Sequence, residues 1–218
     1  MKFALSLFFL CVLAGFSSCE VAKLAQVQMK PIALYDVMPA ADTNAIMGFK
    51  AVSIYANTLD NSVWSSPEKQ CVNLSKENKI VFEGTEALHV KWDKITGGCN
   101  WIGIGFGWNN WQAKDFSEIV DLASIQMKVR SVKGSFKNFP VAFAIEDYTN
   151  VQTYYGFNAS LASGVFTDTA WTTVTIPLSK FPFKAKDADV SKVKQLIIQL
   201  EAEGDVYLDA IKIVKNEK

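Results

Sequence analysis

The sequence is poor in the side chains on which many enzymes and nucleic-acid-binding proteins depend. Its 218 residues include one histidine and four cysteines, and its 22 basic residues balance 22 acidic ones. A chain without a basic excess lacks the surface typical of nucleic-acid binding, so we expect no nucleic-acid partner. There is no C-x-x-C or H-E-x-x-H pair of metal ligands and no G-x-S-x-G nucleophile motif. These absences disfavour a zinc site and a serine hydrolase.

The long apolar run of the chain lies at its N-terminus. Lys2 precedes an apolar run over residues 3–16, and small residues then lead to Cys19. A positive start, a short apolar stretch and a small-residue exit are typical of a secretory signal. Because a membrane-spanning helix needs about 20 apolar residues, we expect this shorter run to be removed rather than retained.

Cys19 makes this signal resemble a bacterial lipobox, in which cleavage precedes a cysteine whose thiol is then lipidated. Phe16 stands three positions before Cys19, where leucine is usual in such motifs. The alternative is ordinary cleavage near Ser17 or Ser18, with Cys19 incidental. Lipidation of both the thiol and the new amine would supply more than one acyl chain, which is enough for stable anchoring.

The organisation that follows has three parts. We expect residues 1–18 to be a lipoprotein signal peptide, residues 19–30 a linker from the lipid anchor, and residues 31–218 a single domain. The predicted location is the cell envelope, with the chain lipid-anchored in the outer membrane on its periplasmic or surface face.

From Pro31 onward, apolar and polar residues alternate in many short segments. Clear examples are residues 88–93, 102–108, 125–130 and 141–146. Alternation at every second residue indicates half-buried antiparallel strands, and the Gly-, Asn- and Ser-rich clusters between them indicate turns. The sequence therefore predicts an all-β fold, an antiparallel β-sandwich or barrel.

Three segments are less regular. Ile80-Val81-Phe82 is a short apolar run that we include among the strands. Asp187–Lys194 is a weak helical candidate, or a turn before a strand. The last strand has a slip of phase near Asp209-Ala210.

Cys71 and Cys99 remain once the anchor is set aside. An exported protein can keep a disulfide, and closing this loop would stabilise the fold by roughly 3–4 kcal/mol on the chain-entropy model. We therefore expect a disulfide between them, with two buried free thiols as the alternative.

Two motifs in the second half of the chain carry a resemblance. Residues 171–181 read W-x-x-V-x-I-P-L-S-x-F, and residues 206–213 read V-Y-x-D-x-I-x-I. The region over residues 80–214 resembles the galactose-binding-like jelly rolls, in particular carbohydrate-binding modules of family 11 and their relatives. The resemblance implies a jelly-roll β-sandwich and a saccharide ligand, without naming the sugar.

The resemblance also implies a structural calcium ion near the final strand, with Asp209 as one oxygen ligand. Ala210 stands where the related pattern has a second aspartate. Calcium takes about six or more oxygen ligands, and Asp36, Glu86 or backbone carbonyls could supply others. The alternative is that Asp209 accepts hydrogen bonds from the backbone.

Trp101 is the first candidate for a sugar platform. It shares its phase with Gly103, Gly105 and Gly107. Glycine weakens a strand, so three on one face suggest room for a ligand. The alternative is that a neighbouring aromatic ring packs on them.

Other candidates alternate with core positions or lie at loop edges, where a sugar site would combine aromatic rings with placed polar groups. The only arginine offers a fork of donors to a hydroxyl pair, with a surface ion pair to Glu146 or Glu201 as the alternative. The full set of predicted ligand-binding residues is Trp101, Arg130, Glu146, Tyr148, Tyr154, Gln199, His89 and Trp111.

These observations favour non-catalytic binding of a poly- or oligosaccharide by an envelope lipoprotein, through an aromatic and polar outer sheet face. A structural role or binding of an envelope protein partner is the second hypothesis, because an aromatic patch does not name its ligand. A glycan hydrolase or lyase is the third. It would need paired carboxylates, for which Glu146 and Glu201 are the candidates.

Overall fold

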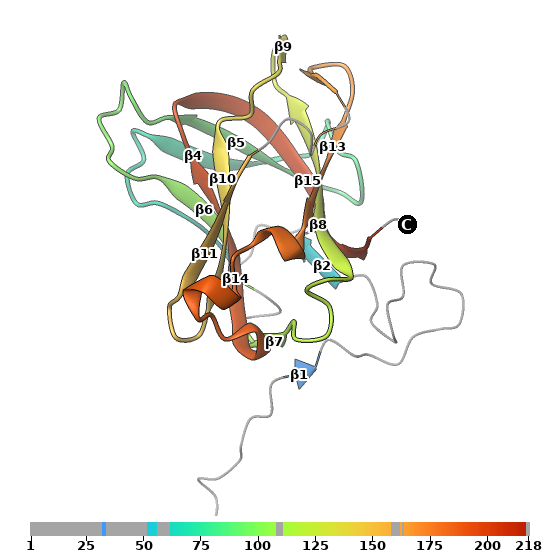
Figure 1. Cartoon of the computed structure of the whole chain (residues 1–218). Coiled ribbons are helices and arrows are strands. Elements are labelled where there is room, and N and C mark those ends of the chain that lie inside the picture. The colour runs from blue at the N-terminus through green and yellow to red at the C-terminus, as the bar shows by residue number, and fades with distance from the viewer. Residues whose placement is uncertain are drawn as a thin grey trace, which may run out of the picture. The chain divides into compact units, whose positions relative to one another are not determined.

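The computed structural model describes residues 32–33, 52–55, 62–107, 111–157, 162 and 164–216. The chain divides into two compact units, Met1–Lys30 and Pro31–Lys218, and every described residue lies in the second. Antiparallel strands dominate this part of the chain, in two large sheets that form a sandwich (Figure 1). The all-β sandwich predicted from the sequence is confirmed. Within the described residues, no helix is long and apolar enough to cross a membrane.

The first large sheet, called sheet A, carries β6 and β14 at its centre. Its main path runs β3-β6-β14-β10-β11, all antiparallel, and β7 pairs with the start of β14 while β1 runs parallel to β7. The strands are β1 (Ile32–Ala33), β3 (Val63–Ser65), β6 (Gly103–Gly107), β7 (Lys114–Asp115), β10 (Val141–Asp147), β11 (Gln152–Gly156) and β14 (Val193–Leu200).

The second large sheet, called sheet B, has the order β13-β8-β15-β5-β4, and β2 also pairs with β15. Its strands are β2 (Val52–Tyr55), β4 (Val72–Glu77), β5 (Ala87–Asp93), β8 (Ala123–Ser131), β13 (Thr172–Pro177) and β15 (Glu203–Lys215).

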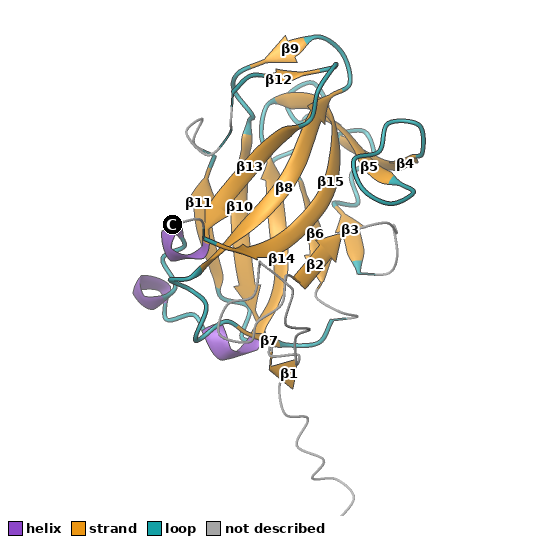
Figure 2. Ribbon diagram, turned by 90° about the vertical axis from the view of Figure 1, so that its right-hand side faces the viewer, coloured by secondary structure: helices purple, strands orange, loops and turns teal. Residues whose placement is uncertain are grey.

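The two ends of the sandwich differ. The small ribbon of β9 (Ser135–Phe136) and β12 (Phe166–Thr167) lies at one end, and three short 3₁₀ helices lie at the other (Figure 2). The helices are η3 (Leu178–Lys180), η4 (Lys184–Lys186) and η5 (Val190–Lys192).

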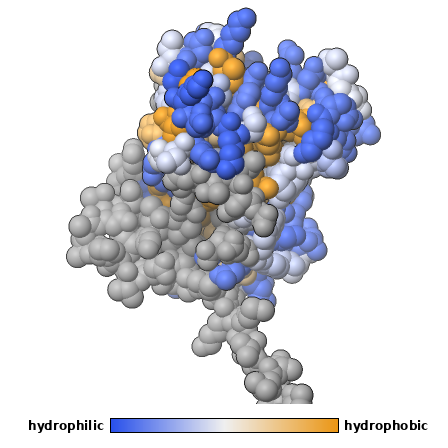
Figure 3. Space-filling view, turned by 180° about the vertical axis from the view of Figure 1, so that it is seen from behind, coloured by the Kyte–Doolittle hydropathy of each residue, from blue (hydrophilic) through white to orange (hydrophobic). Residues whose placement is uncertain are grey.

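The core fills the space between the two sheets. The apolar halves of the alternating segments face each other there and are almost fully buried, with Ile104 and Phe106 of β6 on one side and Ile125 and Met127 of β8 on the other. Packing of two inner sheet faces is the usual core of a sandwich. The described side seen from behind in Figure 3 is mostly hydrophilic, with separate apolar patches.

The structure resolves the three irregular segments. The predicted slip in the last strand is confirmed, because the register shifts between Asp209 and Lys212 and Ala210 has φ 46°. Residues 187–194 form η5 and then the start of β14, so the turn is right and a longer helix is wrong.

The strand predicted over residues 80–82 is wrong. These residues form bends in the loop between β4 and β5. The reason is a competing partner for the backbone, because the amides of Phe82 and Glu83 donate to the buried Asp209 carboxylate at 2.8 and 3.3 Å.

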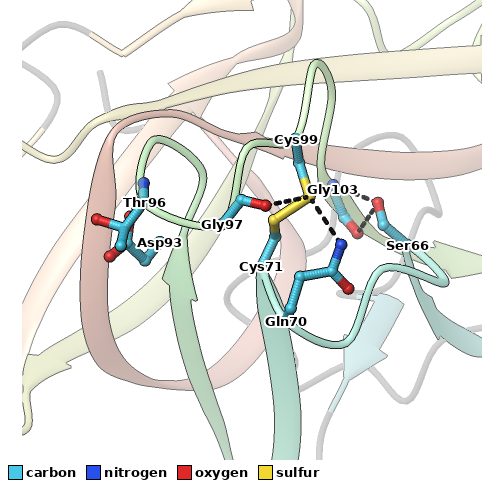
Figure 4. Close-up of a disulfide and its surroundings, with 8 residues drawn as sticks. All are labelled: Ser66, Gln70, Cys71, Asp93, Thr96, Gly97, Cys99 and Gly103. Atoms are coloured by element: carbon cyan, nitrogen blue, oxygen red, sulfur yellow. Dashed lines mark hydrogen bonds between the residues drawn. A yellow bond between two sulfur atoms is a disulfide. The ribbon is translucent and has the colours of Figure 1, made fainter.

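A disulfide joins Cys71 to Cys99, which are 28 residues apart. It connects the start of β4 to the loop that precedes β6, and that loop carries Trp101 two residues after Cys99 (Figure 4). Ser66 adds a second tie nearby, since its hydroxyl accepts a hydrogen bond from the Gly103 amide at 2.8 Å. The segment from Cys99 to Gly103, which carries Trp101, is therefore held at both of its ends.

Removal of the disulfide by replacing both Cys71 and Cys99 with alanine should lower the free energy of unfolding by roughly 3–4 kcal/mol, because the open chain gains loop entropy when unfolded. Urea unfolding of the oxidised protein and of the double variant measures this difference. Reductant should destabilise the wild type and leave the variant unchanged. A wild type that is insensitive to reductant would contradict the prediction.

Candidate ligand-binding face

The side of sheet A that faces away from the core gathers most of the predicted site residues. The pairing registers place three rows of side chains across this outer face, one row for each of Gly103, Gly105 and Gly107 of β6. Each glycine of β6 has one tryptophan ring lying against it. We call Trp101, Trp64 and Trp111, in that order, the tryptophan strip.

The close approach of the rings requires glycine. A side chain on Gly103 would place its Cβ 2.8 Å from the Trp101 ring, and one on Gly107 would lie 2.7 Å from the Trp111 ring. At Gly105 the Trp64 indole is closer still. The structure thus shows the alternative interpretation of the three glycines, because neighbouring aromatic rings pack on them, and those rings are themselves partly exposed.

The middle row is that of Gly105. Across the sheet it reads Trp64 over Gly105, then Ile197, Ala144 and Tyr154. Ile197 and Ala144 are buried, while the Tyr154 side chain is 40 % exposed. Two aromatic residues therefore flank two buried apolar side chains in this row.

The row of Gly107 is polar and is centred on Glu146. Gln195 lies beside Gly107 in the register, Glu146 beside Gln195, and Gln152 beside Glu146. The Glu146 carboxylate accepts hydrogen bonds from Gln152 Nε2 at 2.5 Å, Lys194 Nζ at 2.6 Å and Gln195 Nε2 at 3.0 Å.

The pKa of Glu146 reflects two opposing causes. Burial raises its pKa, but the hydrogen bonds from Lys194, Gln152 and Gln195 together outweigh burial, so the pKa lies below the usual glutamate value. Glu146 is therefore ionised at neutral pH. The Tyr154 hydroxyl donates to Gln152 Oε1, and burial followed by the charge of Glu146 raises the pKa of Tyr154.

The row of Gly103 is more exposed. It reads Gly103, Gln199, Ala142 and Gly156, and the Trp101 indole donates to Gln199 Oε1 at 3.1 Å. Trp101 is 38 % exposed, and its ring is nearly parallel to that of Trp64 at a centroid distance of 6.3 Å.

Trp111 is held from the neighbouring turn. Its φ is 65°, which is costly for a large side chain, and the Tyr148 hydroxyl donates to its carbonyl. Strained backbone is retained where the surroundings over-determine it, often at functional sites. Tyr148 thus acts on this face by holding the backbone of Trp111, and its own side chain is 42 % exposed.

Two predicted site residues lie elsewhere. Arg130 and His89 are on β8 and β5 of sheet B, on either side of Tyr207 in the register. Both Nε and Nη2 of Arg130 donate to the Asp168 carbonyl, at 3.0 and 2.5 Å, in place of the alternative ion pair with Glu146 or Glu201. Alternation indicates which side chains point outward, but it does not say on which of the two sheets.

His89 has local partners in sheet B. Its Nε2 lies 2.6 Å from Asp205 Oδ1 and its Nδ1 lies 3.3 Å from Ser75 Oγ, and its ring packs on Tyr207. It therefore does not join the tryptophan strip.

The residues named for calcium have other partners. The buried Asp209 carboxylate accepts backbone amide bonds from Phe82, Glu83 and Ala210, as the alternative proposed, and Glu86 pairs with Lys76. Burial raises the pKa of Asp209. Within the described part of the chain, no three acidic, histidine or cysteine side chains form a metal-binding group. A calcium ion near Asp209 stays a prediction.

Cys19 and Asp36 lie outside the described residues. Lipidation at the first and a calcium ligand at the second stay predictions.

Sequence reasoning missed Trp64 and Lys194. Trp64 lies on a three-residue strand whose partner, β6, is about 40 positions away in the chain, so no local pattern places the ring on Gly105. The glycines of β6 were the available signal, since they require something to cover them.

A β-sandwich with a strip of partly exposed aromatic rings on one sheet is an arrangement that carbohydrate-binding modules use. The family model for carbohydrate binding domain 30 matches residues 51–215, and the chain belongs to this family. The resemblance to jelly-roll carbohydrate-binding modules is confirmed. The matching model assigns the chain to family 30 of these modules.

Solved structures agree on the fold. A family 30 carbohydrate-binding module from a cellulosomal cellulase of Clostridium thermocellum superposes with a TM-score of 0.62 at 17 % identity, covering 78 % of this chain and all of that one. Another family 30 module gives 0.61 at 18 % identity, covering 78 % and 90 %. A β-1,2-glucanase from Parabacteroides distasonis gives 0.53 at 12 %, covering 77 % and 26 %. No curated protein sequence matches significantly.

Gly105→Ala should displace the Trp64 ring, because the new Cβ would occupy the position of the indole. We expect a cost of about 1–3 kcal/mol in the free energy of unfolding, as for overpacked sites, and an altered near-ultraviolet circular dichroism spectrum. Gly156→Ala is the matched control, since it lies on the same face with nothing within 4 Å of its Cβ. Equal behaviour of the two variants would contradict the assignment.

Proposed function

We propose that this protein binds a polysaccharide chain without cleaving it, through the outer face of sheet A. The observation that carries the proposal is the tryptophan strip, in which three indole rings follow one strand and remain partly exposed. Alternate residues of a strand are about 6.6 Å apart, so the strip spans roughly 13 Å between its outer glycines. A row of this length suits several consecutive sugar units rather than one.

The chemistry of the face matches a sugar. Pyranose rings have apolar faces that pack on aromatic rings, and hydroxyl groups that pair with amides. Trp64, Trp101 and Tyr154 supply the rings, and the partly exposed Gln199 supplies an amide between them. Because one solved relative is a module of a cellulosomal cellulase, cellulose-type glucans are the first ligands to test.

The two candidate acids support binding rather than hydrolysis. A glycosidase needs a carboxylic acid whose pKa is raised so that it can protonate the leaving group. The pKa of Glu146 lies below its usual value for the reasons given, and the hydrogen bond from Lys94 likewise lowers the pKa of Glu201. Both groups are therefore poor proton donors at neutral pH.

We propose an envelope location on the basis of the N-terminal signal. We propose that Cys19 is lipidated and that residues 19–30 connect the anchor to the domain. The anchor would hold a polysaccharide at the cell envelope for other proteins to use. A protein partner on the same face is the competing function, and competition by soluble sugars separates the two.

Trp64→Ala and Trp101→Ala should each weaken polysaccharide binding at least about tenfold, since aromatic anchors at the centre of a site commonly contribute 1.4 kcal/mol or more. Affinity gel electrophoresis in soluble cellulose derivatives and other polysaccharides measures this. Trp171→Ala is the matched control, because Trp171 packs on Phe82 and lies next to β13 of sheet B. A folded wild type that is retarded by no polysaccharide would overturn the proposal.

Cys19→Ala should release the protein from the membrane fraction of a bacterial host and abolish incorporation of labelled palmitate. Cys11→Ala, within the apolar run, is the control and should leave both unchanged. Labelling that persists in Cys19→Ala would exclude this cysteine as the lipidation site.

A further inference from the structure

Two hydrogen-bonded chains of the same composition lie on the outer face of sheet A. In the first, the Trp64 indole donates to Gln195 Oε1 at 2.7 Å, and Gln195 Nε2 donates to Glu146 Oε1 at 3.0 Å. Lys194 Nζ completes it, donating to the same carboxylate at 2.6 Å. The order is tryptophan, glutamine, glutamate, lysine.

The second chain repeats this order four residues further along β14. The Trp101 indole donates to Gln199 Oε1 at 3.1 Å, and Gln199 Nε2 donates to Glu201 Oε1 at 2.5 Å. Lys94 Nζ donates to Glu201 Oε2 at 2.5 Å. The repeat joins residues from different loops and strands, so no local sequence pattern produces it.

Each chain allows only one orientation of its amide. An ionised carboxylate only accepts hydrogen bonds and an indole N–H only donates, whereas an amide has one donor end and one acceptor end. The glutamate therefore draws the amide NH₂ toward itself and leaves the amide oxygen facing the indole. The lysine ammonium keeps the carboxylate ionised.

We infer that Glu146 and Glu201 are positioning residues that set the orientation of Gln195 and Gln199, and through them hold the rings of Trp64 and Trp101. The inference rests on the proposed function of this face. It assigns to the two acids a role that is not catalytic.

The two chains differ in burial. The Glu146 side chain is 7 % exposed, and Gln152 also donates to it, which links it to Tyr154 on β11. The Glu201 side chain is 39 % exposed. An exposed ion pair alone stabilises a protein little, so the consequence of Glu201 lies in what it does to Gln199 and Trp101.

Glu201→Gln tests the inference with the least risk to folding. The new amide must turn its NH₂ toward either Lys94 or Gln199, and both already present donors there. We expect the Kd for a polysaccharide that the wild type binds to rise about three- to tenfold, the equivalent of one hydrogen bond. Glu203→Gln, at a nearby exposed position of β15, should bind as the wild type does.

A ligand-free readout separates this inference from the proposed function. In ¹⁵N-labelled protein, the indole Nε1–H resonance of Trp101 should shift in Glu201→Gln, and that of Trp64 should shift in Glu146→Gln, while Glu203→Gln leaves both in place. Absence of polysaccharide binding by the wild type would refute the proposed function. Unmoved indole resonances in both variants would refute the positioning role, whether or not the wild type binds.

The pH profile gives a further check. Hydrogen bonds from Lys94 and Gln199 lower the pKa of Glu201 despite its partial burial, and the pKa of Glu146 is lowered too. A lowered pKa means that each chain persists above the usual glutamate value of 4.5 and is lost only as pH falls through the lowered value. Wild-type affinity should therefore be equal at pH 7 and at pH 5. Weakened binding at pH 5 in folded protein would contradict the assignment.

Discussion

The packing of tryptophan rings against the glycines of β6 is the contact on which the outer face of sheet A depends. Without side chains at Gly103, Gly105 and Gly107, the rings of the tryptophan strip lie directly on the backbone. The strand beneath them remains in the sheet because its other side carries Ile104 and Phe106 into the core. One short strand thus serves the core with one side and the ligand face with the other.

The polar groups of this face would add selectivity to the contacts that the aromatic rings make. Aromatic surface alone would accept many apolar ligands, whereas amides held in a fixed orientation discriminate among hydroxyl patterns. Glu146 and Glu201 hold those amides, and Lys194 and Lys94 balance their charges. Amides that are held in place before a ligand arrives would lose less entropy on binding.

The two sheets have different tasks. The disulfide ties the loop of Trp101 to sheet B at the start of β4, so the stability of the sandwich and the position of one platform ring are coupled. On sheet B, by contrast, the Arg130 side chain donates to a backbone carbonyl of the same chain, that of Asp168 between β12 and β13.

The sequence by itself determined the all-β class, the inner half of the strands that alternate clearly, such as β5, β8 and β10, and the slip at Asp209-Ala210, because these follow from alternation within one segment. It also identified Trp101, Glu146 and Gln199 as outward-facing. Only the tertiary structure decided that Arg130 and His89 belong to the opposite sheet, and that Trp64 joins the strip. The reason is that period-2 alternation is a local property, whereas the pairing of β3, β6, β14 and β10 joins segments far apart in the chain.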